Sequence, residues 1–209
     1  MALTTKYDPI FRRHGGRLPV AFLRALAYEE SGLNPRAVNP GSENAARGLM
    51  QVVGVVRQDY NERNGTSYTP ADLLDPDISV KLAANLMNRV IGYYAKHPDP
   101  NLHEDWSNPE FVKLLVAGWN AGYSSGGGLQ KVANYLKQRG IPVTHDNVYQ
   151  YASAAGAVSY LSDPKRQAWQ RSVADLFYAQ PDWRSGAGSA ILPVLLVGFV
   201  TWGAFRLLG

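Results

Sequence analysis

Cysteine is absent from this chain of 209 residues. That absence excludes disulfide scaffolds, cysteine-based zinc sites and cysteine nucleophiles. The 4 histidines are scattered without the spacing of metal ligands, so we expect no metal site and no cofactor. Neither sign of charge dominates, since 21 Lys and Arg stand against 17 Asp and Glu, a net charge of +4. So small an excess, with no clustered basic helix, argues against nucleic acid as a partner.

Long apolar runs are also missing, except at the C-terminus. No run of signal-peptide length follows the first residue, so we expect no cleaved secretory signal. Residues 185–205 carry no charge, and as a helix they would span about 31 Å, close to a hydrocarbon core of about 30 Å. We therefore predict a folded domain over 1–180, a linker over 181–189 and one transmembrane helix over 190–209. The alternative is a buried C-terminal core helix.

Helical periodicity runs through the rest of the chain, without strand-like alternation of useful length. The Asp-Pro pairs at 75–76 and 163–164 are typical helix starts. Long loops rich in Gly, Asn and Ser separate the helices, and such loops commonly carry function. The fold class is therefore all-α. The expected helices cover residues 18–31, 49–61, 76–95, 109–120, 129–139, 147–161 and 164–179.

Glu30 does not fit the apolar pattern around it. Phe22, Leu23 and Leu26 precede it at helical spacing and share its face. A carboxyl on such a face has a raised pKa, as a general acid near neutral pH requires. The alternative is a salt-bridged Glu at a frayed helix end. Glu29 is turned about 100° away around the helix, and we expect it to face solvent or to lie in the second layer of residues around the site.

Three short motifs begin at Glu30. Residues 30–37 read E-S-G-L-N-P-R-A, residues 48–51 read G-L-M-Q, and residues 118–122 read G-W-N-A-G. In this order they resemble the motifs of the soluble lytic transglycosylase family, which are E-S-x-x-x-P-x-A, G-L-M-Q and A-Y-N-A-G. The third motif departs from the family pattern, because Gly118 replaces Ala and Trp119 replaces Tyr.

The resemblance covers about residues 18–160 and implies a lysozyme-like helical domain of the goose-type kind. It implies one catalytic acid/base, Glu30, and no cofactor. A downstream tyrosine completes the family's site, and the count from Pro142 favours Tyr149, with Tyr151 as the alternative. The other substrate-binding residues that it implies are Ser31, Gly48, Leu49, Met50, Gln51, Trp119, Asn120, Ala121 and Gly122.

The implied chemistry needs one carboxylate, whereas most glycosidases need two. Protonated Glu30 would donate to the glycosidic oxygen between N-acetylmuramic acid and N-acetylglucosamine. As a base it would then take the proton of the C6 hydroxyl, which closes on C1 and leaves a 1,6-anhydro sugar. A hydrolase of the same fold is the first alternative and needs a second carboxylate. Glu43, Asp59 and Glu62 are the nearest candidates in the sequence. An inactive wall-binding or structural protein is the second alternative.

The expected partners are a peptidoglycan glycan strand, a lipid membrane at the C-terminal helix, and other proteins of a virion or an envelope complex. An enzyme of this class must reach the wall, although no export signal is visible. We therefore expect a membrane-anchored bacteriophage virion protein that acts in the host periplasm and opens the wall for passage of the genome. A bacterial envelope enzyme anchored by its tail is the alternative.

Overall fold

The computed structural model of the chain describes residues 2–42, 44–123, 128–157 and 159–186. Within these residues no strand forms, and isolated bridges join only Val38, Arg47 and Val52. The predicted all-α class is therefore confirmed. The α-helices are α1 (Asp8–His14), α2 (Val20–Ser31), α3 (Gly54–Asn64), α4 (Pro76–Tyr94), α5 (Pro109–Ala121), α6 (Leu129–Lys137), α7 (His145–Tyr151) and α8 (Pro164–Tyr178). Short 3₁₀ helices are η1 (Asp72–Leu74), η2 (Pro100–Leu102), η3 (Ser159–Leu161) and η4 (Trp183–Gly186).

Three α-helices begin with the same local chemistry, an Asp or Asn followed by proline. Asp75, Asn108 and Asp163 each accept a hydrogen bond from the backbone N–H two residues later, at the starts of α4, α5 and α8. The proline suits the first helical turn because a free N–H there would have no helical partner. The helices predicted to start at 76, 109 and 164 are confirmed.

Residues 48–51 form a tight turn, although the periodicity predicts a helix from residue 49. Gly48 and Gln51 have φ angles of 78° and 47°, which an α-helix does not contain. A Cβ on Gly48 would lie 1.8 Å from the carbonyl oxygen of Leu73, so glycine alone fits there. Helix α3 therefore begins at Gly54, and the predicted start was wrong.

The helix expected over 147–161 is also wrong in its extent. Helix α7 ends at Tyr151, and Gly156 turns the chain with a φ of 64° before η3 begins. Helix α1 was not predicted, because its 7 residues are too few to show a helical period.

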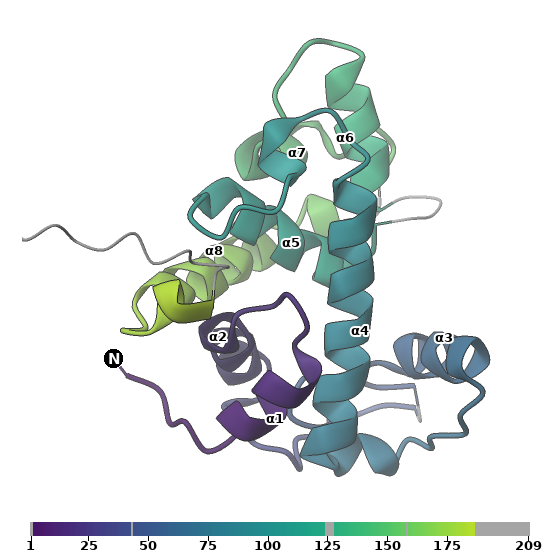
Figure 1. Ribbon diagram of the computed structural model, residues 1–209. Coiled ribbons are helices and arrows are strands. Elements are labelled where there is room, and N and C mark those ends of the chain that lie inside the picture. The colour runs from purple at the N-terminus through teal and green to yellow at the C-terminus, as the bar shows by residue number, and fades with distance from the viewer. Residues whose placement is uncertain (1, 43, 124–127, 158, 187–209) are drawn as a thin grey trace, which may run out of the picture.

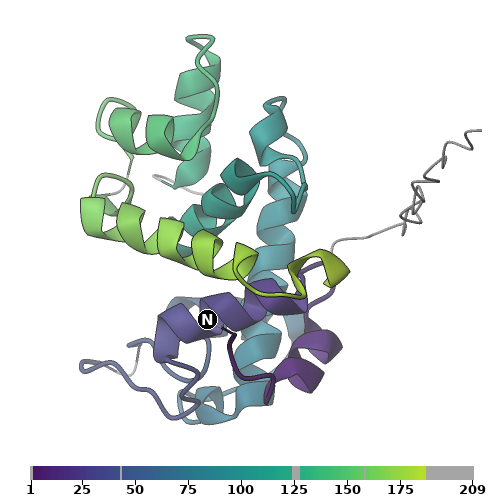
Figure 2. The same cartoon turned by 90° about the vertical axis from the view of Figure 1, so that its left-hand side faces the viewer.

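Helix α4 is the long axis of the molecule, with α1 and α3 packed on one half and α6 and α7 beyond the other (Figure 1). Helix α8 lies along α2 and also packs on α5 (Figure 2). One continuous apolar core includes Phe22 and Leu26 of α2, Phe111 and Leu115 of α5 and Phe177 of α8. Helices α2, α5 and α8 are thus fixed relative to one another by a shared core.

A buried ion-pair network ties both ends of the described domain to α2. Arg24 is 2% exposed and donates two hydrogen bonds to Asp8 and two to Asp182, over 2.7–3.0 Å. A buried guanidinium needs such partners because an unpaired buried charge is very costly. Trp183 packs on Phe177 with ring centroids 5.9 Å apart. Asp182 and Trp183, which fall in the predicted linker, thus contact α2 and α8.

The predicted transmembrane helix over 190–209 lies outside the described residues, as do residues 187–189 of the predicted linker. In the part of the chain that the structure describes, no helix combines the length and the apolarity that crossing a membrane requires.

Candidate active site

Glu30 lies in the last turn of α2, where the helix leaves the core. Residues 21–27 of this helix are buried, whereas the last four are partly exposed. Gly32 ends the helix with a φ of 64°, and its N–H donates back to the preceding turn. A left-handed residue at this position favours glycine. The core therefore fixes the helix, and the helix presents Glu30 at the edge of the core.

The carboxyl of Glu30 receives a strong hydrogen bond from an indole. Trp119 Nε1 lies 2.6 Å from Glu30 Oε1. Burial raises the pKa of Glu30 to about 7. The hydrogen bond from Trp119 and the positive charge of Arg166 oppose this rise in pKa, whereas the negative charge of Glu29 adds to it. Near neutral pH the carboxyl is therefore close to half protonated, so it can both give and take a proton.

Glu29 points to α8 instead. Its Oε1 accepts a hydrogen bond of 2.7 Å from the hydroxyl of Ser172, and its backbone carbonyl accepts one of 3.4 Å from the indole of Trp169. Consecutive helical residues differ by about 100° in direction, which separates the two carboxyls. Glu29 therefore joins α2 to α8, and Glu30 is the carboxyl left for chemistry.

Ser31 connects the helix of Glu30 to the G-L-M-Q turn. Its Oγ lies 2.8 Å from the carbonyl oxygen of Leu49 and 3.1 Å from that of Ala27. A hydroxyl has a single proton to donate, and these two acceptors compete for it. Ser31 thus holds the turn against the end of α2, and its predicted contact with a sugar stays a prediction.

The side chains of the G-L-M-Q turn face inward. Leu49 and Met50 are 0% exposed and belong to the core, and Gln51 is also buried. Gln51 Nε2 donates to the carbonyls of Gly48 and Ala37, at 2.9 and 3.2 Å. Both protons of that amide are used, so Oε1 of Gln51 is the side-chain atom of this turn that remains for a sugar.

The glycine in the third motif has a local cause. A Cβ on Gly118 would lie 2.5 Å from the hydroxyl oxygen of Tyr94. That hydroxyl is buried and donates to the carbonyl of Leu114 at 2.5 Å. The hydroxyl of Tyr94 thus occupies the space in which the alanine of the family pattern would place its methyl group.

The rest of the third motif lies at the end of α5. Trp119, Asn120 and Ala121 are partly exposed, and Gly122 follows with a φ of 73°. Asn120 Oδ1 accepts a hydrogen bond of 3.0 Å from Arg166 Nη1 of α8. The structure thus brings the end of α5 against Glu30 on one side and against α8 on the other.

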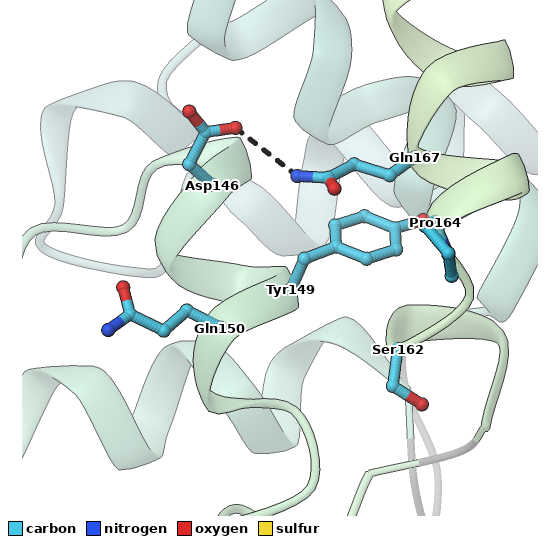
Figure 3. Close-up of a pocket in the computed structure, with 6 residues that line it drawn as sticks. All are labelled: Asp146, Tyr149, Gln150, Ser162, Pro164 and Gln167. Atoms are coloured by element: carbon cyan, nitrogen blue, oxygen red, sulfur yellow. Dashed lines mark hydrogen bonds between the residues drawn. The ribbon is translucent and has the colours of Figure 1, made fainter.

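Tyr149 and Tyr151 take different positions on α7. The Tyr149 hydroxyl donates to Gln170 Oε1 at 2.9 Å, and burial raises the pKa of Tyr149 to about 12. Its ring points across a surface pocket of about 310 Å³ toward the start of α8 (Figure 3). Tyr151 lies against Tyr135 of α6, with ring centroids 6.2 Å apart. Tyr149 is thus linked to α8, which also contacts α2 and α5, and the choice of Tyr149 over Tyr151 stays a prediction.

Helix α8 carries side chains that contact the predicted site and that the sequence analysis did not single out. The spacing of residues 166, 169 and 170 places them on one face of a helix, and this spacing is the feature of the sequence that could have identified them. It does not reveal which other helix that face contacts. The contacting residues are Arg166, Trp169, Gln170 and Ser172.

Metal-ligand clusters are absent from the described ranges, since no three His, Asp or Glu side chains there could hold one ion. The histidines have structural contacts instead, since His14 lies 2.9 Å from Asp77 and His97 Nδ1 accepts from the N–H of Asp99. His145 Nε2 lies 2.9 Å from Gln170 Oε1, and His103 Nε2 lies 2.8 Å from the carbonyl oxygen of His97.

The family model of the transglycosylase SLT domain matches residues 11–141, more than half of the chain. This chain belongs to that family. It is 29% identical over 135 residues to the membrane-bound lytic murein transglycosylase F of Histophilus somni, covering 65% of this chain and 23% of that protein. The protein of the same name from Yersinia enterocolitica is 28% identical over 117 residues, covering 56% of this chain and 20% of that protein. The chain thus spans less than a quarter of the length of these curated relatives.

The fold is also found in a solved structure, the 70 kDa soluble lytic transglycosylase from Escherichia coli. The TM-score is 0.58 at 16% identity, over 90% of this chain and 25% of that chain. The expected family and its fold are confirmed. Because the family match ends at residue 141, the contributions of α7 and α8 to the site rest on the structure of this chain.

Proposed function

We propose that this domain is a peptidoglycan lytic transglycosylase. It cleaves the β-1,4 bond between N-acetylmuramic acid and N-acetylglucosamine and leaves a 1,6-anhydro end on the muramic acid. The observation that carries this proposal is the partly buried Glu30 carboxyl, which Trp119 holds at 2.6 Å and whose pKa is about 7. Membership of the SLT family and relatives named lytic murein transglycosylases support it.

The hydrogen bond from Trp119 determines which oxygen of Glu30 carries the proton. Because the indole N–H can only donate, Oε1 is an acceptor, and the acid proton belongs on Oε2. Oε2 then donates to the glycosidic oxygen as the bond to C1 of the muramic acid breaks. The carboxylate that forms keeps the Trp119 hydrogen bond and has the positive charge of Arg166 nearby.

The same carboxylate completes the reaction. It takes the proton of the C6 hydroxyl of the muramic acid, and the C6 oxygen bonds to C1. The ring closes without water, and Glu30 is again protonated. One group with a pKa near the working pH suits both proton transfers.

The groups proposed to hold the sugar lie on separate elements of the fold. Asn120 on α5 and Oε1 of Gln51 offer hydrogen bonds, and Tyr149 on α7 offers a ring beside a pocket. The remaining predicted binding residues act by shaping the backbone close to the sugar. They are Ser31, Gly48, Leu49, Met50, Ala121 and Gly122.

The described candidates give the hydrolase alternative no second carboxylate in contact with Glu30. Asp59 pairs with Arg63 at 2.7 Å and also with Arg89. Glu43 lies outside the described residues, and Glu62 is exposed on α3. Neither Asp59 nor Glu62 forms a hydrogen bond or ion pair that would bring it beside Glu30, so the transglycosylase is the better supported function.

Two adjacent carboxyls give a matched test. The full chain, Glu30→Gln and Glu29→Gln are each incubated with purified peptidoglycan, and the soluble muropeptides released are quantified. We expect Glu30→Gln to lose at least about 1,000-fold in rate, because the acid is gone, and Glu29→Gln to keep most of the activity. Equal activity of Glu30→Gln and the wild type would overturn the proposal.

We also propose the cellular setting, a membrane-anchored phage virion protein that opens the host wall for passage of the genome. The uncharged run 185–205 and the word membrane-bound in the names of the relatives support the anchor. Flotation of the full chain with lipid vesicles tests it, with Leu195→Arg as the variant expected to stay in the unbound fraction. Detection of the chain in purified phage particles by mass spectrometry tests whether it is a virion protein.

A further inference from the structure

Helix α8 lies beyond the segment that the family model matches, yet it contacts both sides of the site. Ser172 and Trp169 hold Glu29 on α2, and Arg166 holds Asn120 on α5. Figure 2 shows α8 running along α2, with α6 and α7 on the opposite side of α8. The contacts of α8 with α2 and α5 therefore lie outside the segment that the family model describes.

Arg166 is held in place from several directions. Its Nη1 donates to Asn120 Oδ1 at 3.0 Å, and its Nε lies 3.7 Å from a carboxylate oxygen of Asp163. Its Cζ lies 3.9 Å from the centroid of the Tyr160 ring, which suits the stacking of a guanidinium on an aromatic face. A side chain with these contacts, and 36% exposed, has little freedom to leave Asn120.

The hydrogen bond from Arg166 determines how Asn120 meets a ligand. A guanidinium is only a donor, so it selects Oδ1 of Asn120 and leaves the amide NH2 on the other side. That NH2 has no acceptor among the residues that the structure describes. It is therefore available to a carbonyl oxygen of a ligand, such as that of an acetamido group, and does not suit a donor.

Two charged groups of opposite sign act on Glu30. Glu29 acts from the same helix, and Arg166 acts from α8. Glu29 is bound to Ser172, so its position is fixed as well. The positive charge stabilises the carboxylate that remains after Glu30 has given up its proton.

We propose that Arg166 is a positioning residue of this site, with two effects. It orients the amide of Asn120 so that the NH2 group faces an acetamido carbonyl of the bound glycan, and it places a fixed positive charge beside Glu30. This inference rests on the proposed transglycosylase function.

The test compares three variants of the full chain with the wild type and with Glu30→Gln. Arg166→Lys keeps the charge but loses the planar donor, Arg166→Gln loses both, and Lys165→Gln removes one exposed charge from the same helix as the control. The initial rate of muropeptide release from peptidoglycan is measured across pH 5 to 9. Asn120→Ala is measured as well, both by itself and together with Arg166→Lys.

The two effects predict different outcomes. Arg166→Lys should lower the rate roughly 10-fold at every pH, because Asn120 loses its charge-assisted hydrogen bond. In Asn120→Ala the same substitution should change the rate less than about 2-fold, because the two residues act as one unit. Arg166→Gln should also move the fall of the rate at alkaline pH to higher pH, since Glu30 keeps its proton longer. Lys165→Gln should match the wild type.

Two results would overturn the inference, and together they distinguish its own failure from a failure of the proposed function. In the first, Glu30→Gln is inactive but both Arg166 variants have the rate and the pH profile of the wild type. This result would exclude the role of Arg166 and leave the proposed function intact. A wild type that releases no more than Glu30→Gln would remove the proposed function and this inference with it. Arg166→Lys keeps the test valid if Arg166→Gln does not fold.

Discussion

Trp119 donates a hydrogen bond of 2.6 Å to Glu30 across 89 residues of sequence. It joins the last turn of α2 to the last turn of α5. Burial raises the pKa of Glu30, and this hydrogen bond limits the rise. The acid of the site thus depends on two helix ends that a common core holds together.

Trp119→Phe should move the pH dependence of activity. The substitution keeps an aromatic ring and removes the N–H that lowers the pKa of Glu30. The acid then stays protonated to higher pH, so the fall of the rate at alkaline pH should shift upward, with a lower maximum because the carboxyl is less well held. The measurement is the initial rate of muropeptide release against pH.

Trp169→Phe is the matched control for this prediction. Trp169 donates to the backbone carbonyl of Glu29, not to a carboxyl. Its pH profile should therefore keep the position of the wild type. An alkaline fall that is unmoved in Trp119→Phe would contradict the role given to the hydrogen bond.

Glu30 should make the domain less stable at high pH. Its pKa is 4.5 without perturbation and about 7 in the folded chain, so the folded state binds the proton more tightly than the unfolded state. The stabilisation by this proton is fully present below pH 4.5 and is lost as the pH rises through 7, about 3 kcal/mol in total. Glu30→Gln, which is neutral at all pH and still accepts from Trp119, should escape this loss.

Urea unfolding of the wild type and Glu30→Gln at pH 4.5 and pH 8 checks this prediction. The free energies of unfolding should be similar at pH 4.5, and Glu30→Gln should be the more stable by about 3 kcal/mol at pH 8. Glu29→Gln should show no such gain, because it weakens the contact with Ser172. A constant difference between Glu30→Gln and the wild type at both pH values would contradict the raised pKa.

Gly48→Ala should disrupt the turn that carries the G-L-M-Q motif. The new Cβ would lie 1.8 Å from the carbonyl oxygen of Leu73, in a residue with a φ of 78°. We expect a loss of about 4 kcal/mol or more in the free energy of unfolding. Gly140→Ala is the control, because Gly140 has a φ of 65° but nothing within 4 Å of an added Cβ. It should cost only about 1–2 kcal/mol, and equal losses in the two variants would show that the close contact does not matter.

Tyr149→Phe should reduce activity more than Tyr151→Phe. The Tyr149 hydroxyl is held by Gln170 of α8, whereas Tyr151 packs on Tyr135. Loss of a positioned hydroxyl at the site should lower the rate about 10-fold or more, and loss of the Tyr151 hydroxyl should leave it within about 2-fold. Muropeptide release rates at one pH decide between the two residues. The reverse order would assign the role to Tyr151.

Local chemistry made a large part of this fold predictable. The Asp-Pro and Asn-Pro starts of α4, α5 and α8 depend on residues next to one another, so the sequence alone identifies them. Glu30 was also recognisable, because an apolar helical face that ends in a carboxylate is visible as a pattern. The three motifs then indicated the family that the comparison confirmed.

What the sequence did not reveal depends on distant residues or on backbone angles. The apolar spacing of Leu49 and Met50 suits a helix, but the positive φ angles of Gly48 and Gln51 place them in a turn. The hydrogen bond of Trp119 to Glu30 follows from the packing of α2 and α5 on α8 and into a shared core. The role of Arg166 follows from the position of α8, and helical periodicity predicts that helix without its partners.

The mass of the products tests the central claim most directly. The full chain is incubated with purified peptidoglycan, and the released muropeptides are weighed by mass spectrometry, with Glu30→Gln in parallel. The account predicts muramic acid ends that are one water lighter than those of a hydrolase, and no such products from Glu30→Gln. Reducing ends that have gained a water would contradict the transglycosylase and require a second catalytic group beside Glu30.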